Sequence, residues 1–585
     1  MNETGPLAQA LQLSRSGKHA EAEKVCKQIL ASNQSDPRVW CHLGTCYLSL
    51  NRFEEAIKAY DQAVKRHPRF AEAINNMGVA YARLGKVDQA IQYFNQARAA
   101  RPNWAEPSIS LGNLYVSHER FDEAMETFAQ AARAEPLNPE PQLLVATIMA
   151  RMGRLDIARQ HFVESLRLNP RNAVAHSNLL LALNYDPEID PTILLNEHVW
   201  FDRLQGQGMA PVAPYVNQKN PDRPLRVGYV SPDLRRHAVA WFMLPVFESH
   251  DPKNFLLYAY ASQTDQDAIT DRFRAKCTGW RSIIAMNDVQ VAEQIRGDGI
   301  DVLVDLAGHT SGNRMGVFTR RPAPVQVTYL GYPNTTGLSA IGYCITDSAV
   351  DPVGSGKSFV EKLIRLPGCF CCFAPPDDLP AVTPPPCIEN GYITFGLLHK
   401  LAKYNPPMLD LWTRVLREVP GSRAIIFRDS LDQSAQQELS RQFAEREIDP
   451  SRLEFIKQTA REGAHYASYA KFDISLDSLP WSGHTTSCES MWMGVPMITL
   501  RGNRHAGRMA ASILQTVGVP ELIAENADHY LQIARELAGD LERLKRYRGE
   551  LREKVKRSPL GDPVTFTRGL ESAYRQIWHR WCKGA

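Results

Sequence analysis

The first third of the chain repeats one arrangement of small, aromatic and proline residues with a period of 34 positions. Small residues let two helices approach closely, aromatic residues fill the space behind them, and proline ends the second helix of each pair. The pattern therefore predicts one helix–turn–helix in each period. The recurring positions are Gly44, Gly78, Gly112 and Ala146; Ala56, Ala90, Ala124 and Ala158; Tyr60, Phe94, Phe128 and Phe162; and Pro68, Pro102, Pro136 and Pro170.

These periodic units resemble the tetratricopeptide repeat. Together they predict an α-solenoid over residues 1–185. Stacked repeats present a concave surface that holds an extended peptide or another protein, so we expect acceptor proteins to bind in this groove; a purely structural spacer is the other interpretation. Full units are expected at 37–70, 71–104, 105–138 and 139–172, with a degenerate copy at 3–36 and a helical cap at 173–185.

In the rest of the chain, short apolar runs alternate with helical stretches. Buried strands that alternate with helices predict parallel sheets in doubly wound α/β layers. We expect a linker at 186–224, a first lobe at 225–375, a Pro-rich segment at 376–390 and a second lobe at 391–585. The strand-like runs are 226–231, 301–308, 324–331, 393–396, 424–430, 453–456, 473–478 and 496–500.

Charge and hydropathy narrow the classes of partner. The chain has 67 Lys and Arg residues against 64 Asp and Glu residues, and the two signs are interspersed. This distribution is unlike the basic face of a nucleic-acid-binding protein. The sequence shows neither a cationic leader with an apolar run nor a bilayer-spanning segment. We therefore expect a cytoplasmic protein that binds neither nucleic acid nor a membrane.

The 11 cysteines do not predict a metal site. The group Cys369, Cys371 and Cys372 lacks the paired spacing of a zinc site, and reduced thiols are expected. Within the repeats, His42 and Cys46 are interpreted as packing residues rather than ligands.

One segment after an expected strand has the composition of a phosphate-binding site. Following 473–478, the sequence LPWSGHTTSCES places His484, Thr485 and Thr486 at the start of an expected helix. Free backbone N–H groups, threonine hydroxyls and the helix dipole favour a phosphate or diphosphate there. Glu489, one turn further on, is a candidate acceptor for a ribose hydroxyl. The same residues fit a threonine N-cap with glutamate at N3, which needs no ligand, and spacing alone does not choose between the two.

Three longer segments carry a likeness to a known family. They are RVGYVSPDLRRHAVAWF at 226–242, AGHTSGNR with RPAPVQVTYLGYPNTTG within 307–337, and FDISLDSLPWSGHTTSCESMWMGVP at 472–496. With the upstream repeats, they resemble the O-GlcNAc transferase and SPINDLY family of protein glycosyltransferases over almost the whole chain. The resemblance implies a GT-B fold of two Rossmann-like lobes. It also implies an inverting, metal-independent transfer of a sugar from a nucleotide diphosphate sugar to Ser or Thr of a protein.

The resemblance further implies roles for individual residues. His237 matches the active-site histidine, proposed as a base, and Lys403 matches the lysine that neutralises the leaving diphosphate. Lys403 and the helix N-terminus would supply positive charge without a metal or other cofactor. The nucleotide-sugar site would further include His484, Thr485 and Thr486 at the phosphates, Glu489 at the ribose, and His465 with Ala460, Arg461 and Glu462 at the base.

Departures from the family pattern leave the donor open. Before Lys403 the chain reads FGLLHKLAK, which places His399 and Lys400 where relatives carry an Asn-rich or Gln-bearing stretch. Lys400 either adds a phosphate contact or reshapes the pocket. The His-Thr-Thr of 484–486 resembles the O-GlcNAc transferase branch, whereas the following Cys-Glu-Ser resembles SPINDLY. The resemblance to SPINDLY implies GDP-fucose as the donor, and the resemblance to the other branch implies UDP-GlcNAc.

Three hypotheses for the function follow from these features. The leading one is a protein O-GlcNAc transferase that uses UDP-GlcNAc. The others are an O-fucosyltransferase that uses GDP-fucose and a repeat scaffold that binds nucleotide without turnover. The oligomeric state cannot be read from the sequence.

Overall fold

The computed structural model describes residues 5–206, 214–377, 379–457 and 464–584. These residues form two compact units, one of residues up to 148 with 160–169 and the other of 149–159 with the chain from 170 onward. No helix within the described ranges is long and apolar enough to cross a membrane. The cytoplasmic location expected from the sequence stays a prediction.

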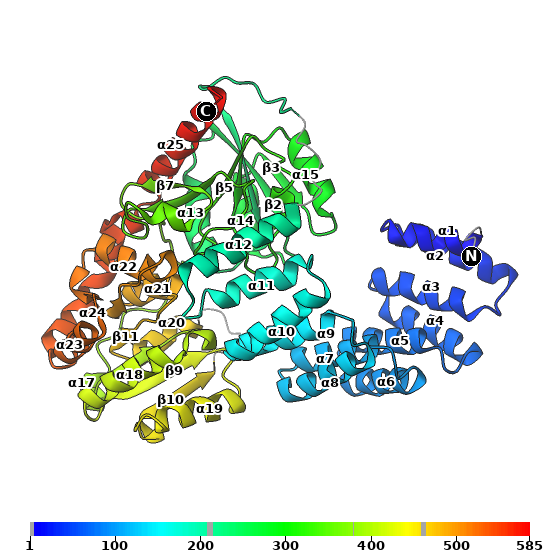
Figure 1. The fold of residues 1–585 in the computed structure, drawn as a ribbon, viewed down its shortest axis with the longest axis horizontal. Helices are drawn as coiled ribbons and strands as arrows, with labels where there is room; N and C mark the ends of the chain where they lie inside the picture. The colour runs from blue at the N-terminus through cyan, green and yellow to red at the C-terminus, as the bar shows by residue number, and fades with distance from the viewer. Residues whose placement is uncertain (1–4, 207–213, 378, 458–463, 585) are drawn as a thin grey trace. The chain divides into compact units, whose positions relative to one another are not determined.

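The repeat pattern folds into paired antiparallel helices (Figure 1). The close approach of each pair depends on the periodic glycines: a Cβ atom added at Gly44 would lie 2.6 Å from the ring of Tyr60, and one at Gly78 would lie 2.7 Å from the ring of Phe94. The helices are α1 (Pro6–Arg15), α2 (His19–Ser32), α3 (Pro37–Ser49), α4 (Phe53–Arg66), α5 (Ala71–Arg83), α6 (Val87–Ala100), α7 (Glu106–Ser117), α8 (Phe121–Ala134), α9 (Glu140–Arg151), α10 (Leu155–Leu168) and α11 (Ala173–Leu183), the last at the expected cap.

The turn inside each helix pair has a second periodic feature. Gly17, Asn51, Gly85, Glu119 and Gly153 follow one another at 34-residue intervals, and each has a positive φ between 58° and 79°. A left-handed residue reverses the chain between the two helices, and this conformation costs a non-glycine residue about 1 kcal/mol or more. Glycine at three of these five positions removes that cost.

The first α/β lobe is a parallel sheet with strand order β3-β2-β1-β4-β5-β6-β7. The expected linker at 186–224 contains helix α12 (Pro191–Gly206). The other elements are β1 (Leu225–Ser231), α13 (Ala240–Ser249), β2 (Phe255–Ala261), α14 (Ala268–Lys276), β3 (Gly279–Ser282), α15 (Asp288–Gly297), β4 (Val302–Asp305), α16 (Met315–Phe318), β5 (Val325–Thr328), β6 (Tyr343–Asp347), η1 (Ser355–Ser358) and β7 (Lys362–Leu366).

The second lobe is another parallel sheet, with strand order β10-β9-β8-β11-β12-β13. Its elements are α17 (Cys387–Asn390), β8 (Thr394–Leu397), η2 (Leu401–Lys403), α18 (Pro406–Glu418), β9 (Arg423–Arg428), α19 (Gln433–Ala444), η3 (Pro450–Arg452), β10 (Leu453–Lys457), α20 (Ala464–Ser468), η4 (Tyr469–Lys471), β11 (Ile474–Leu476), α21 (Thr485–Trp492), β12 (Met497–Leu500), α22 (His505–Val517), η5 (Pro520–Leu522), β13 (Ile523–Ala524), α23 (Ala527–Ala538), α24 (Leu541–Arg557), η6 (Pro559–Gly561) and α25 (Pro563–Cys582).

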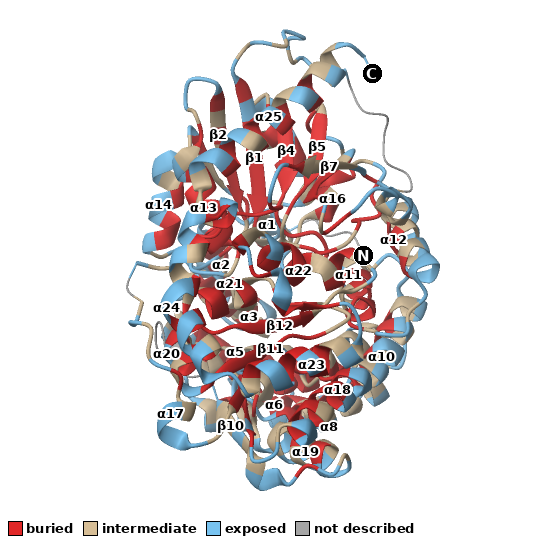
Figure 2. Ribbon diagram, turned by 90° about the vertical axis from the view of Figure 1, so that its left-hand side faces the viewer, coloured by how far each residue is buried: buried red, intermediate tan, exposed pale blue. Residues whose placement is uncertain are grey.

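The two lobes share one hydrophobic core, and the strands of both sheets are largely buried (Figure 2). Helix α22 of the second lobe is joined to the end of β6 in the first: His505 Nδ1 lies 2.7 Å from a carboxylate oxygen of Asp351, and the Ser512 hydroxyl donates to Asp347 at 2.6 Å. Helix α25 returns to pack against α13, β5 and β7. These contacts hold the two sheets in one orientation relative to each other.

The predicted fold class, helical repeats followed by two parallel α/β lobes, is confirmed.

Candidate functional site

Both sheets reverse their strand order beside their first strand, between β1 and β4 and between β8 and β11. Open α/β sheets bind ligands outside the carboxyl ends of the strands at such a switch point, because the loops diverge there. Three groups of predicted site residues follow these strands: His237 after β1, Lys400 and Lys403 after β8, and the segment 484–489 after β11.

The loop after β8 is anchored by His399. Its Nε2 donates to the carbonyl oxygen of Leu476 in β11 at 2.6 Å, and its ring stacks on Trp412 with centroids 5.6 Å apart. Burial lowers the pKa of His399 to about 3, so the imidazole is neutral. At this position the chain departs from the family pattern. His399 has a structural role there, because it joins the loop after β8 to β11, the two strands beside the switch point.

Lys403 brings a buried ammonium group to this point. Its Nζ donates to the carbonyl oxygen of Ser482 at 3.0 Å, and 9% of the residue is exposed. Burial lowers the pKa of Lys403 to about 7; the Asp477 carboxylate opposes that shift, and the cations Lys400 and Arg428 add to it. Burying a positive charge is costly, and an anion placed here would stabilise it.

Lys400 and Arg428 enlarge the positive region around Lys403. Lys400 is exposed, and Arg428 ends β9, the strand next to β8. Sequence reasoning missed Arg428, although its position at the carboxyl end of a strand beside the switch point was a usable signal. Cations therefore follow two adjacent strands, β9 and β8, at the same edge of the second sheet.

Asp477 holds the loop after β11 in place. Its two carboxylate oxygens accept hydrogen bonds from the Gly483 amide at 2.7 Å and the Thr499 hydroxyl at 2.6 Å. Burial raises the pKa of Asp477, and the charge of Lys403 counteracts part of that effect. Asp477 was also missed by sequence reasoning, because its partners lie on a later loop and on another strand.

The N-terminus of α21 lacks a side-chain cap among the residues that the structure describes. His484 occupies the N-cap position without a capping hydrogen bond, and Thr485 and Thr486 begin the helix, partly exposed. The capping arrangement left open by the sequence is not formed here, since Glu489 bonds other side chains. The N–H groups of a first helical turn have no partners within the helix, so this end can bind an anion. The buried Ser487 hydroxyl also has no hydrogen-bond partner.

His484 joins the two lobes at the same place. Its ring stacks on Phe242 of α13 with centroids 4.1 Å apart and lies 5.0 Å from the ring of Phe370. Burial lowers the pKa of His484 to about 3, and its Nε2 is buried without a partner. A neutral imidazole with an unused nitrogen therefore lies between the first lobe and the start of α21.

His237 lies in the loop after β1, and 41% of its side chain is exposed. Its Nδ1 accepts the backbone N–H of Val239 at 3.3 Å and lies 3.6 Å from the Asp233 carboxylate. Desolvation lowers the pKa of His237, while Asp233 opposes the shift. With Nδ1 accepting, the neutral ring carries its proton on Nε2, so this state presents a hydrogen-bond donor.

Glu489 and His465 contact each other. Glu489 accepts from His465 Nε2 at 3.1 Å and from the Tyr469 hydroxyl at 3.2 Å. A carboxylate has about four acceptor sites, so Glu489 keeps capacity for a further donor such as a ribose hydroxyl. The predicted residues Ala460, Arg461 and Glu462 lie outside the described residues.

The turn between α9 and α10 touches the loop that carries Lys403. Gly153, one of the periodic left-handed residues, has φ +79°, and a Cβ added there would lie 2.8 Å from the carbonyl oxygen of Leu401. The equivalent turn residue Gly85 has φ +72° and nothing within 4 Å of such a Cβ. Close contact with the Lys403 loop thus distinguishes Gly153 from Gly85.

Comparison with known proteins places this arrangement in a family. The model of glycosyl transferase family 41 matches residues 196–374 and 387–570, and tetratricopeptide-repeat models match 7–63, 47–103 and 81–148. The chain belongs to glycosyltransferase family 41. The predicted membership in the O-GlcNAc transferase and SPINDLY group, with its upstream repeats, is confirmed.

Curated relatives of the chain come from plants and from Caenorhabditis elegans. A protein of Solanum lycopersicum named probable UDP-N-acetylglucosamine–peptide N-acetylglucosaminyltransferase SPINDLY is 40% identical over 415 residues, which are 70% of this chain and 45% of that protein. The similarly named SEC of Arabidopsis thaliana is 30% identical over 371 residues, 62% of this chain and 38% of that protein. The chain spans about half the length of the curated relatives it matches.

A solved structure of the family has the same fold. A mutant of the Thermobaculum terrenum O-GlcNAc transferase superposes with a TM-score of 0.81 at 33% identity, and the match covers 88% of this chain and 98% of that one. The helical repeats and the two parallel sheets of the present chain therefore correspond to the repeat array and GT-B architecture that the sequence predicted.

The contact at Gly153 makes a prediction about the Lys403 loop. Both Gly153→Ala and Gly85→Ala place a side chain at a left-handed position, which costs about 1–2 kcal/mol in each case. Only Gly153→Ala also displaces the Leu401 carbonyl. Hydrogen exchange should therefore become faster across 398–405 in Gly153→Ala and stay unchanged there in Gly85→Ala. Equal exchange in the two variants would contradict the contact.

Proposed function

We propose that the chain is a protein O-glycosyltransferase that moves GlcNAc from UDP-GlcNAc to Ser or Thr of acceptor proteins, with inversion and without a metal. The observation that carries this proposal is the uncapped N-terminus of α21 beside the buried Lys403 ammonium group at a switch point. Backbone N–H groups and a lysine together neutralise a diphosphate, which is the charge that develops as the nucleotide leaves.

The chemistry follows from that placement of charge. The acceptor hydroxyl oxygen attacks the anomeric carbon from the side opposite the diphosphate, and the bond from that carbon to the β-phosphate oxygen breaks. The nucleotide leaves with the bonding electrons, and the hydroxyl proton passes to solvent. Lys403 Nζ uses one of its three N–H groups on Ser482, so two remain for phosphate oxygens.

We further propose that His237 binds the donor substrate through Nε2–H. Its Nδ1 already accepts from Val239, so the ring is arranged to donate rather than to remove a proton. His484 and the first turn of α21 would contact the phosphates, and Glu489 would accept from the ribose. Acceptor proteins are proposed to bind the repeat array, as stacked repeats commonly bind extended chains.

GDP-fucose is the second candidate donor. The observation that favours it is the higher identity to SPINDLY, 40%, than to SEC, 30%. The SPINDLY branch of the resemblance implies fucose transfer, and the two donors differ in the base as well as in the sugar.

A donor panel tests the proposed function. UDP, UDP-GlcNAc, GDP and GDP-fucose are titrated by calorimetry, and the sugar moved to candidate acceptor proteins is identified from the mass that it adds. We expect selective binding of the uridine compounds and transfer of N-acetylhexosamine that persists in EDTA. Lys403→Met should weaken nucleotide binding by about tenfold to a hundredfold, since a hydrogen bond to a charged group contributes about 1.5–3 kcal/mol.

Lys471→Met provides the matched control, because Lys471 precedes β11 at the opposite, amino end of the strand and is exposed. This variant should bind like the wild type. Selective binding of the guanosine compounds, with transfer of a deoxyhexose, would show that the donor is GDP-fucose and not UDP-GlcNAc. Absence of binding by any of the four compounds would refute a catalytic role, and nucleotide binding without transfer to any acceptor would support the scaffold hypothesis.

The lowered pKa of Lys403 predicts that nucleotide binding takes up a proton. With a pKa of about 7 in the free protein, roughly a tenth of the Lys403 side chains are protonated at pH 8. The diphosphate raises this pKa, so the complex binds more protons than the free protein and the affinity for UDP falls as pH rises above about 7. Calorimetry at pH 8 in buffers of different ionisation enthalpy should detect uptake that approaches one proton.

The uptake should be smaller at pH 6, where the free lysine is already largely protonated. It should disappear in Lys403→Met and remain in Lys471→Met. An unchanged uptake in Lys403→Met would show that another group accepts the proton.

A further inference from the structure

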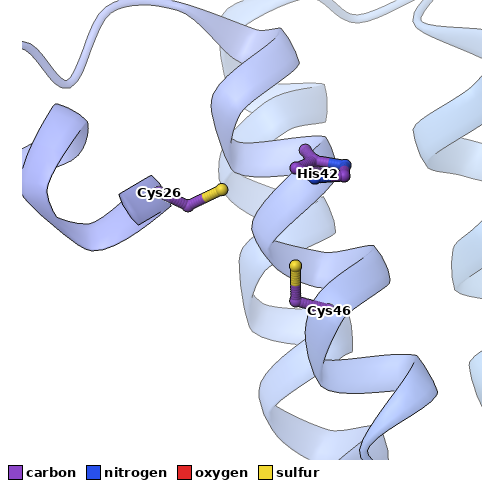
Figure 3. A group of neighbouring side chains, drawn as sticks. All are labelled: Cys26, His42 and Cys46. Carbon is purple, nitrogen blue, oxygen red and sulfur yellow. The ribbon is translucent and has the colours of Figure 1, made fainter. Parts of the chain in front are cut away.

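A cluster of two thiols and an imidazole lies in the first helices of the repeat array, far along the chain from the residues of the candidate site (Figure 3). Cys26 belongs to α2, and His42 and Cys46 belong to α3. The potential ligand atoms of these three residues all lie within 4.8 Å of one another. In the described part of the chain, this is the one group of three or more His, Cys, Asp or Glu side chains with that geometry.

Helix geometry explains why the three side chains meet. His42 and Cys46 are four residues apart, so both project from one face of α3, one turn from each other. Figure 3 shows the Cys26 sulfur pointing from α2 toward that face. Both cysteines are fully buried, whereas His42 is partly exposed and leaves a route from the surface. From the sequence, His42 and Cys46 were interpreted as interior packing residues; the third member of the cluster, Cys26, lies on a different helix.

We propose that Cys26, His42 and Cys46 bind one zinc-like cation through two thiolate sulfurs and one imidazole nitrogen. Two thiolates and an imidazole form a ligand set that zinc prefers, with a fourth position for a water molecule or another oxygen. The Ser14 hydroxyl of α1 lies 3.1 Å from His42 Nε2 and 3.7 Å from Cys46 Sγ. It is therefore placed to bind a water molecule in that fourth position.

The required movement is small. A tetrahedral zinc ion with Zn–S bonds of about 2.3 Å holds two sulfurs about 3.8 Å apart, so ligand atoms within 4.8 Å of one another need to move by about 1 Å. Side-chain rotation on fixed helices supplies this change. His42 exchanges its hydrogen bond to Ser14 for the metal bond.

The charges balance when the cation binds. On binding, both thiols lose a proton to solvent, and two thiolate charges neutralise the two charges of the cation.

The imidazole argues for a cation rather than a disulfide. A disulfide would use only Cys26 and Cys46, would need an oxidant, and would leave His42 without a role. A cation uses all three groups and links α2 to α3, while Ser14 adds α1.

Cobalt binding to the full-length protein tests the site. The untagged protein is kept reduced with a phosphine, stripped of metal by a chelator and titrated with Co²⁺ and then with Zn²⁺. We expect one equivalent of Co²⁺ to produce thiolate-to-cobalt charge transfer and the visible absorption of a tetrahedral complex, and Zn²⁺ to abolish both. Zinc should also slow hydrogen exchange in α2 and α3.

Single substitutions test whether the metal binds at the cluster or at other cysteines. Cys26→Ser and His42→Gln should lose the cobalt absorption and the zinc-dependent protection. Cys41→Ser, which changes a buried cysteine of α3 outside the cluster, should keep both. His42→Gln retains a polar group beside Ser14, so it tests the ligand with little change in packing, and circular dichroism confirms that each variant is folded.

Several results would overturn the proposal. They are the absence of a cobalt–thiolate spectrum in the reduced wild type, retention of that spectrum in folded Cys26→Ser and His42→Gln, and its loss in Cys41→Ser alone. A Cys26–Cys46 disulfide in air, with no metal uptake by the reduced protein, would assign the two thiols to redox chemistry instead. Nucleotide binding is measured in the same samples as a separate property, because this proposal does not rest on the proposed function.

Discussion

The hydrogen bond from Lys403 to the carbonyl oxygen of Ser482 is the constraint around which the second lobe is organised. It joins the loop after β8 to the loop after β11, the two strands between which the sheet reverses its order. Burial of an ammonium group costs several kcal/mol when its compensation is incomplete. The protein meets part of this cost through the nearby charge of Asp477, and the lowered pKa shows that a deficit remains. An anionic ligand compensates the remaining cost of burying the Lys403 charge. The buried charge therefore destabilises the free protein and favours binding of the anion.

Other features of the lobe serve that geometry. His399 fixes the loop before Lys403 to β11, and Asp477 fixes the loop after β11 through Gly483. His484 connects the start of α21 to the first lobe by stacking on Phe242. Neutral histidines at 399 and 484 add no positive charge, so the attraction for an anion is concentrated in Lys403, its neighbouring cations and the start of α21.

The repeats could be predicted from the sequence because their packing is local. Gly44 must be small to accommodate Tyr60, and this relation recurs with the period of the helix pair. Several strands were harder to predict. The run FLLYAYA of β2 is continuously apolar and cannot be distinguished from a buried helix by periodicity, and β13 has only two residues. Family motifs point to Lys403 and His484 as candidate site residues. The roles of His399 and Asp477 depend on partners in other strands and loops, which the folded chain brings together. The Cys26–His42–Cys46 cluster was also missed, because its members belong to two helices and meet only in the folded chain.

We propose that a nucleotide diphosphate binds between Lys403 and the first turn of α21, and a crystal structure of the protein with UDP would show whether it does. We expect a β-phosphate within hydrogen-bond distance of Lys403 Nζ and of the backbone N–H groups of Thr485 and Thr486, with a ribose hydroxyl directed to Glu489. A diphosphate bound elsewhere, with Lys403 still bonded only to Ser482, would refute this binding site.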